Sequence, residues 1–158
     1  MRRSRVRFPL WAPFSRGPIG DSHRVGRVTL GCLVLLAGVM HFLNPGFFNE
    51  IVPPWLPPSE SFWTYASGVA EIVIGLMLLR SSTRRRGAIA AIWLFVCVYP
   101  ANLYMTWDWR DRPAGEQFVS WARLPLQFVI IWWAWRIAEK NRQEDSWPGS
   151  TFPTAAPN

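Results

Sequence analysis

Five polar residues that lie inside long apolar stretches are the best candidates for chemistry in this 158-residue chain: His41, Glu71, Asn102, Arg123 and Gln127. An ionisable side chain in a membrane-length apolar segment is costly unless it finds a partner, so such residues commonly mark proton pathways or ligand sites. A carboxylate can accept a proton, and a guanidinium or an imidazole can donate hydrogen bonds to a carbonyl oxygen. We therefore expect the five residues to form one ligand-binding cluster.

Glu71 has the greatest need of a partner, because it falls near the middle of its apolar stretch. Arg123 and Gln127 are four residues apart and share one face of another predicted helix. We expect Glu71 to pair with Arg123, either directly or through another cluster member or water. The alternative is that the cluster only fixes the register of the helices, as interhelical polar contacts do in many membrane proteins.

The sequence contains no motif for a metal or a tightly bound cofactor. Cys32 and Cys97 are the two cysteines, and they form neither a C-x-x-C pair nor part of a metal-binding framework. A Gly-rich nucleotide loop and a pair of axial-type histidines are also missing, so a haem, a flavin or an iron–sulfur centre is not expected.

Four apolar stretches have to position these residues. The sequence predicts helices over about 28–43, 61–79, 87–107 and 118–137, each close to the roughly 20 residues that cross a bilayer. The segment 47–61 between the first two stretches contains four prolines, which exclude a long helix or a central strand there. Its remaining residues are aromatic and apolar, so we expect this loop to lie in the membrane interface.

The positions of the basic residues predict the orientation. The N-terminal segment, the turn at 80–86 and the C-terminal tail hold most of the 17 Lys and Arg residues, whereas the connection near residue 111 holds only Arg110 and Arg112. Basic loops stay on the cytoplasmic side. We therefore expect an all-α integral membrane protein of the bacterial cytoplasmic membrane, a four-transmembrane-helix bundle with both termini inside. A rise of about 1.5 Å per residue then places all five polar residues in the outer half.

The composition also divides the chain into three parts. Residues 1–26 are basic and contain Pro and Gly, so we expect a disordered segment, which is also compatible with an over-extended start site. Residues 27–138 are expected to form the membrane domain, and residues 139–158 a disordered tail. The net charge is +7, but the basic residues do not alternate with aromatic residues on one helical face. The expected partner is thus the lipid bilayer and not nucleic acid.

Five segments resemble the DoxX-like family of small bacterial membrane proteins. They are HFLNP at 41–45, IVPPWLP at 51–57, SGVAE at 67–71, YPANLYM at 99–105 and RLPLQ at 123–127. The resemblance implies a four-helix bundle, and it places the recurring polar positions of that family on the five residues above, without a catalytic assignment. It also implies a link to quinone-dependent sulfur oxidation or to thiol and redox maturation. This chain lacks paired cysteines, which argues against disulfide exchange by the chain alone.

These observations predict an accessory membrane component of a quinone-linked or redox-protective system, a subunit that works beside an oxidoreductase and not a stand-alone enzyme. Glu71 would accept a proton, and His41 or Arg123 would donate a hydrogen bond to a quinone carbonyl. The alternative is a noncatalytic scaffold or a lipid-binding protein. A transporter or channel would need oligomerisation or an inverted repeat, and the two halves of the sequence show no clear repeat. Homo-oligomerisation stays open.

Overall fold

The computed structural model describes residues 19–145, and within this range every regular element is helical. The four long helices are α1 (Ile19–Leu43), α3 (Glu60–Leu79), α4 (Arg84–Asp108) and α5 (Ala114–Asp145). Two short helices are α2 (Pro45–Asn49) and the 3₁₀ helix η1 (Trp109–Asp111). The disorder expected for residues 1–18 and 146–158 lies outside the described part of the chain.

The first and last long helices are longer than the sequence predicted. Residues 19–26 belong to α1 and residues 139–145 belong to α5, although both segments were expected to be disordered. Extending an existing helix adds one hydrogen bond for each residue that is fixed, so elongation is far easier than starting a new helix. In α5 the added segment also contains Glu, Lys, Arg and Gln, which are good helix formers.

The connection between α1 and α3 contains a short helix that the sequence did not predict. Pro45 occupies the first turn of α2, where a missing backbone N–H costs nothing. The four later prolines of this connection follow α2 and lie outside any helix, in agreement with the prediction. Helix α3 then begins after Ser59, whose Oγ accepts a hydrogen bond from the backbone N–H of Phe62 at 3.2 Å.

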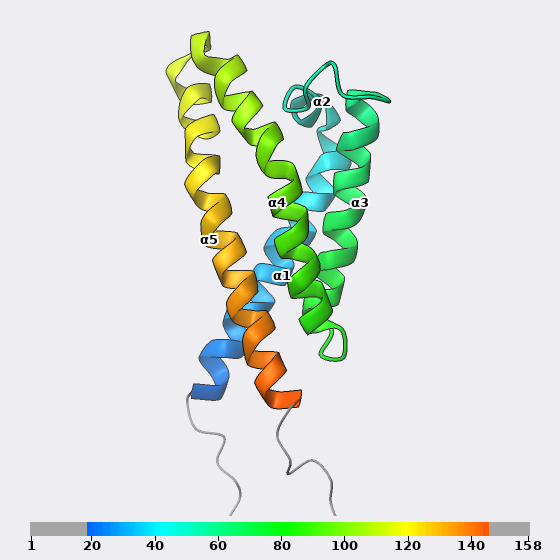
Figure 1. Cartoon of the computed structure of the whole chain (residues 1–158), viewed down its shortest axis with the longest axis vertical. Helices are drawn as coiled ribbons and strands as arrows, with labels where there is room; N and C mark the ends of the chain where they lie inside the picture. Colours follow the sequence, from blue (N-terminus) through cyan, green and yellow to red (C-terminus); the bar gives the residue numbers. More distant parts are fainter. Residues whose placement is uncertain (1–18, 146–158) are drawn as a thin grey trace, which may run out of the picture.

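The long helices are arranged as two pairs (Figure 1). Helix α1 packs along α3, α4 packs along α5, and contacts between α3 and α4 join the pairs. The beginning of α1, the turn between α3 and α4, and the end of α5 lie at one end of the bundle, which we call the basic end because it carries Arg80, Arg85 and Arg86. Helices α2 and η1 lie at the opposite end, which we call the α2 end.

Two separate apolar clusters hold the bundle. The larger one fills the half toward the basic end and includes Leu30, Val34, Ile74, Leu78, Ala88, Ala91, Ala134, Ile137 and Ala138. The smaller one lies at the α2 end, where Ile51, Met105 and Trp109 are buried against Phe47, Phe48 and Ala101. The polar cluster predicted from the sequence falls between them.

Within residues 19–145, three segments are long and apolar enough to cross a membrane: Val25–Leu43, Glu60–Leu79 and Arg84–Asp111. Large apolar side chains also cover the outside of the bundle; Leu36 is 59% exposed, Trp93 66% and Val69 53%. An apolar surface of this extent is typical of a protein that lies in a membrane. Helix α5 is long enough to span but less apolar, since it holds Arg123, Gln127 and four tryptophans.

Candidate functional site

A cavity of about 280 Å³ lies between the two apolar clusters. Residues of all four long helices line it, together with residues from α2 and the segment that follows α2. All five residues predicted from the sequence are among the lining residues, and the remaining wall is largely apolar: Ala37, Phe48, Ile51, Val52, Leu126 and Ile130 belong to it. The structure therefore brings the predicted cluster together in one place.

Two glycines allow α1 and α3 to bring His41 and Glu71 together. A Cβ atom at Gly38 would lie 2.9 Å from the Cβ of Glu71 and 2.8 Å from the carbonyl oxygen of Gly68. A Cβ atom at Gly68 would lie 2.8 Å from the Cβ of His41. Small residues at such positions let two helix backbones approach closely, as is common in membrane bundles.

Glu71 is buried beside His41. The Nδ1 atom of His41 lies 2.9 Å from the carbonyl oxygen of Ala37 and 3.5 Å from Oε2 of Glu71. When Nδ1 carries a proton, His41 donates it to Ala37, and this bond fixes the ring against its own helix. The Oε2 atom of Glu71 has no hydrogen-bond partner within the described residues. A buried acceptor in this state costs free energy that a ligand or a bound proton can recover.

Asn102 and Gln127 form a satisfied polar contact between α4 and α5. The Nδ2 group of Asn102 donates to Oε1 of Gln127 at 2.7 Å, and Nε2 of Gln127 donates to the carbonyl oxygen of Phe95. Phe95 lies five residues before Pro100 and directly before Val96, whose carbonyl oxygen lacks its helical partner because Pro100 has no N–H. Gln127 is only 3% exposed. These two amides therefore join two helices and supplement the backbone of α4.

Arg123 forms no direct ion pair with Glu71 among the described residues, so of the predicted pairings only the indirect one, through His41 or water, stays a prediction. Its guanidinium lies over the ring of Phe47, 5.3 Å from the ring centroid, and makes no hydrogen bond within residues 19–145. A cation is attracted to the face of an aromatic ring, and His41 occupies the place beside Glu71 instead. The half-buried donors of Arg123 line the cavity.

Phe47 and Phe48, which cover Arg123 and His41, were not predicted as residues of the site. The ring of His41 stacks on Phe48 with centroids 3.7 Å apart and an interplanar angle of 24°. Phe47 lies under Arg123 and contacts Trp109 edge to face at 5.9 Å. The adjacent aromatic residues after Pro45 are visible in the sequence, but nothing in their spacing indicates which side chains they cover.

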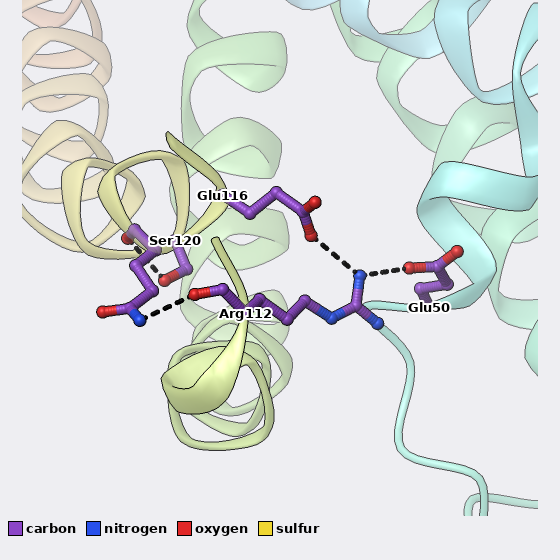
Figure 2. Close-up of polar contacts among 5 residues, drawn as sticks. Glu50, Arg112, Glu116 and Ser120 are labelled. Atoms are coloured by element: carbon purple, nitrogen blue, oxygen red, sulfur yellow. Dashed lines mark hydrogen bonds and ion pairs between the residues drawn. The ribbon is translucent and has the colours of Figure 1, made fainter. Parts of the chain in front are cut away.

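A second polar cluster lies at the α2 end, outside the cavity lining, and Figure 2 shows its geometry. The Nη1 group of Arg112 donates to Glu50 at 2.7 Å and to Glu116 at 3.2 Å. The guanidinium also lies 4.3 Å from the ring centroid of Trp109. The hydrogen bond to Glu50, with a smaller contribution from Glu116, raises the pKa of Arg112. This residue therefore remains charged throughout the physiological pH range.

Comparison with known proteins identifies a family but no activity. A family model described as "Domain of unknown function (DUF8561)" matches residues 30–138. No curated protein and no solved structure matches the chain.

Proposed function

This chain belongs to the family of the domain of unknown function DUF8561, whose description names no activity. From the cavity, we propose that the protein binds the head group of a quinone-like amphiphile within the membrane. The observation that carries this proposal is the combination of groups on the cavity wall. Arg123 has no ion pair and Glu71 has an oxygen without a hydrogen bond, and both line one largely apolar cavity among the described residues.

The size and lining of the cavity suit part of a ligand. Small-molecule pockets commonly have volumes of about 300 to 1,000 Å³ and apolar walls with a few polar groups. At about 280 Å³, this cavity is at the lower end of that range. It has room for a ring-sized head group, while an apolar tail would extend between the helices into lipid.

The polar groups suit a ligand with carbonyl or hydroxyl oxygens. The guanidinium of Arg123 has five N–H donors in a planar fork, which would bind a quinone carbonyl. Glu71 and His41 line another part of the wall and would accept or return a proton when the ligand changes redox state. The reducing or oxidising equivalents would come from a partner oxidoreductase, which makes this protein an accessory component.

We also propose that all four long helices cross the membrane and that the basic end faces the cytoplasm. Arg80, Arg85, Arg86 and Lys140 lie toward this end, whereas Arg110 and Arg112 lie toward the α2 end. This distribution supports the orientation because basic loops resist translocation. The bacterial cytoplasmic membrane is the compartment that this arrangement and the resemblance to DoxX-like proteins favour. That resemblance also supports the link to redox chemistry.

A noncatalytic scaffold is the second candidate, and one observation favours it. The amides of Asn102 and Gln127 satisfy each other and the carbonyl of Phe95, as groups that only hold helices in register would do. Under this reading the cavity is a packing defect of the bundle. The two candidates therefore differ in whether Glu71 and Arg123 contact a ligand.

The test is to isolate the protein with its native lipids and to measure bound quinone by chromatography and mass spectrometry. We expect about one quinone per chain in the parent and loss of most of it in Glu71→Gln and Arg123→Gln, because each change replaces one ionisable group of the wall by a neutral amide. Arg136→Gln is the matched control, since Arg136 is an exposed arginine of the same helix and does not line the cavity.

A folded parent protein that retains no quinone, or a retained quinone that is insensitive to Glu71→Gln and Arg123→Gln, would favour the scaffold. Loss of quinone in Arg136→Gln as well would show that the loss does not depend on the cavity.

A further inference from the structure

The segment that covers the cavity at the α2 end is attached unequally on its two sides. We call residues 45–58 the lid; they comprise α2 and the Pro-rich loop, and Phe48, Ile51 and Val52 of the lid line the cavity. The backbone of α2 comes close to α1 and α3 but not to α4, η1 or α5. Within the lid, α2 is therefore attached to α1 and α3, and a seam separates its backbone from the other helix pair.

Polar contacts also hold the lid on the side of α3. The Nδ2 group of Asn49 donates to Oγ of Ser61 at 3.2 Å, and Nε1 of Trp63 donates to the carbonyl oxygen of Pro57 at 3.0 Å. Both partners on α3 follow the lid directly in the sequence. These bonds would persist if the lid moved away from α4 and α5.

Across the seam, the contacts of the lid in the described part of the chain are made by side chains. Ile51 packs with Met105 and Trp109, and Trp55 contacts Tyr104 edge to face at 4.8 Å. Phe47 contacts Trp109 and lies under Arg123, and Glu50 accepts a hydrogen bond from Arg112 at 2.7 Å. Figure 2 shows Arg112 extended from the segment between η1 and α5 toward Glu50. Within the described part of the chain, this ion pair joins the lid to the α4–α5 pair. It is partly exposed, since the side chain of Arg112 is 35% exposed and that of Glu50 is 51% exposed.

We propose that residues 45–58 act as a lid over the cavity, that the ion pair between Glu50 and Arg112 is its latch, and that Phe47 and Phe48 are positioning residues. A docked lid places Phe48 against His41 and Phe47 against Arg123. Opening the seam would release both basic side chains and admit a ligand from the α2 end. The role of the lid in admitting a ligand rests on the proposed ligand site, but the motion of the lid can be measured without any ligand.

The experiment measures how fast a cationic methanethiosulfonate reagent reaches a cysteine under the lid. Ser67→Cys supplies this cysteine because Ser67 lines the cavity, and Cys32 and Cys97 are both replaced by Ala because both are exposed. The full chain is held in lipid nanodiscs, where the reagent reaches both faces of the membrane. The readout therefore does not depend on the orientation of the protein.

We expect Glu50→Gln and Arg112→Gln each to raise the modification rate of Ser67→Cys by about threefold to fivefold, the effect of losing one partly exposed ion pair. The double variant should react no faster than the single variants, because both changes break the same contact. Glu116→Gln and Arg110→Ala are matched controls, since neither change removes the contact with Glu50. Ser82→Cys, exposed at the basic end, checks that the reagent reacts equally with every variant.

An unchanged rate in Arg112→Gln, with the parent's unfolding midpoint retained, would overturn the latch. Equal acceleration by Arg112→Gln and Arg110→Ala would overturn it as well, because a general loosening of that end would then explain both. A faster rate in Glu50→Gln and Arg112→Gln supports the lid even if the protein retains no quinone, so failure of the ligand proposal is separable from failure of the lid.

Discussion

At the scale of single residues, the cavity contains polar groups of two kinds. Asn102 and Gln127 have their hydrogen bonds satisfied by each other and by the backbone of α4. Glu71 keeps an oxygen without a hydrogen bond, and Arg123 lies over the face of Phe47 with no hydrogen bond or ion pair to another described residue. The first kind stabilises the bundle whether or not a ligand is present. The second kind costs stability in the empty protein and is where a ligand would find partners.

Replacing Gln127 tests the structural part of the cluster. Gln127→Leu leaves the amide of Asn102 without its partner and removes the interhelical hydrogen bond to the carbonyl of Phe95, so we expect the free energy of unfolding to fall by about 1 to 2 kcal/mol. Detergent-induced unfolding in mixed micelles measures this change. Val129→Ala is the control, because Val129 is on the same helix and 52% exposed, and it should shift the unfolding free energy far less. Equal losses in the two variants would contradict the assignment.

A second residue-scale prediction concerns the partner of Glu71. Because His41 lies 3.5 Å from Glu71 and Arg123 forms no ion pair with it, Glu71 should couple more strongly to His41. Double-mutant cycles of unfolding with Glu71→Ala, His41→Ala and Arg123→Ala measure both couplings. We expect about 0.6 kcal/mol or more for the pair with His41, a typical value for a polar contact in a membrane bundle. A larger coupling to Arg123 would restore the pairing predicted from the sequence.

At the scale of helices, the two pairs are held by different means. Helices α1 and α3 meet through glycines, and a Cβ atom at Gly75 would lie 2.8 Å from the backbone nitrogen of Leu35. Helices α4 and α5 are instead joined by the amides of Asn102 and Gln127. The Oγ of Thr106, 2.9 Å from the carbonyl oxygen of Asn102 on its own helix, also lies 3.3 Å from that of Ser120 and shares its one proton between the two. The first pair therefore depends on the absence of side-chain volume, and the second on directed hydrogen bonds.

Adding one methyl group between α1 and α3 should separate them. In Gly38→Ala the new Cβ would meet backbone atoms of Gly68 and Ile72 at 2.8 Å, and backbone cannot yield as a flexible side chain does. We expect a loss of about 1 to 3 kcal/mol in the free energy of unfolding. The matched control is Gly115→Ala, where a Cβ meets nothing within 4 Å, and unfolding should be unchanged or slightly harder. An unaffected Gly38→Ala variant would contradict the close approach.

At the scale of the whole molecule, the sequence predicted what depends on apolar length and on rare residue types. The helical class and the positions of the long helices follow from uninterrupted apolar stretches, and the gathering of all five polar residues follows from their similar depth in those stretches. The contacts of Arg123 with Phe47 and of Arg112 with Glu50 were not predicted. They join parts of the chain that are far apart in sequence, so they depend on how the helix pairs dock, which no local spacing encodes.

The orientation in the membrane is the remaining whole-molecule prediction, and it depends on whether α5 crosses as the other long helices do. Single cysteines at three exposed or half-buried positions test it: Ser82→Cys between α3 and α4, Asp111→Cys in η1, and Lys140→Cys near the end of α5. Each cysteine is introduced into a chain that lacks Cys32 and Cys97. In intact cells that express these variants, a membrane-impermeant maleimide should label only Asp111→Cys. All three should react once the membrane is permeabilised.

Each alternative gives a different labelling pattern. If α5 lay along the surface at the α2 end, Lys140→Cys would also react in intact cells, and three crossings would replace four. If the whole bundle were inverted, Ser82→Cys and Lys140→Cys would react and Asp111→Cys would not. The expected pattern depends on the basic end of the bundle, where the α3–α4 turn and the end of α5 lie. Translocating this end would carry most of the positive charge of the described residues across the membrane.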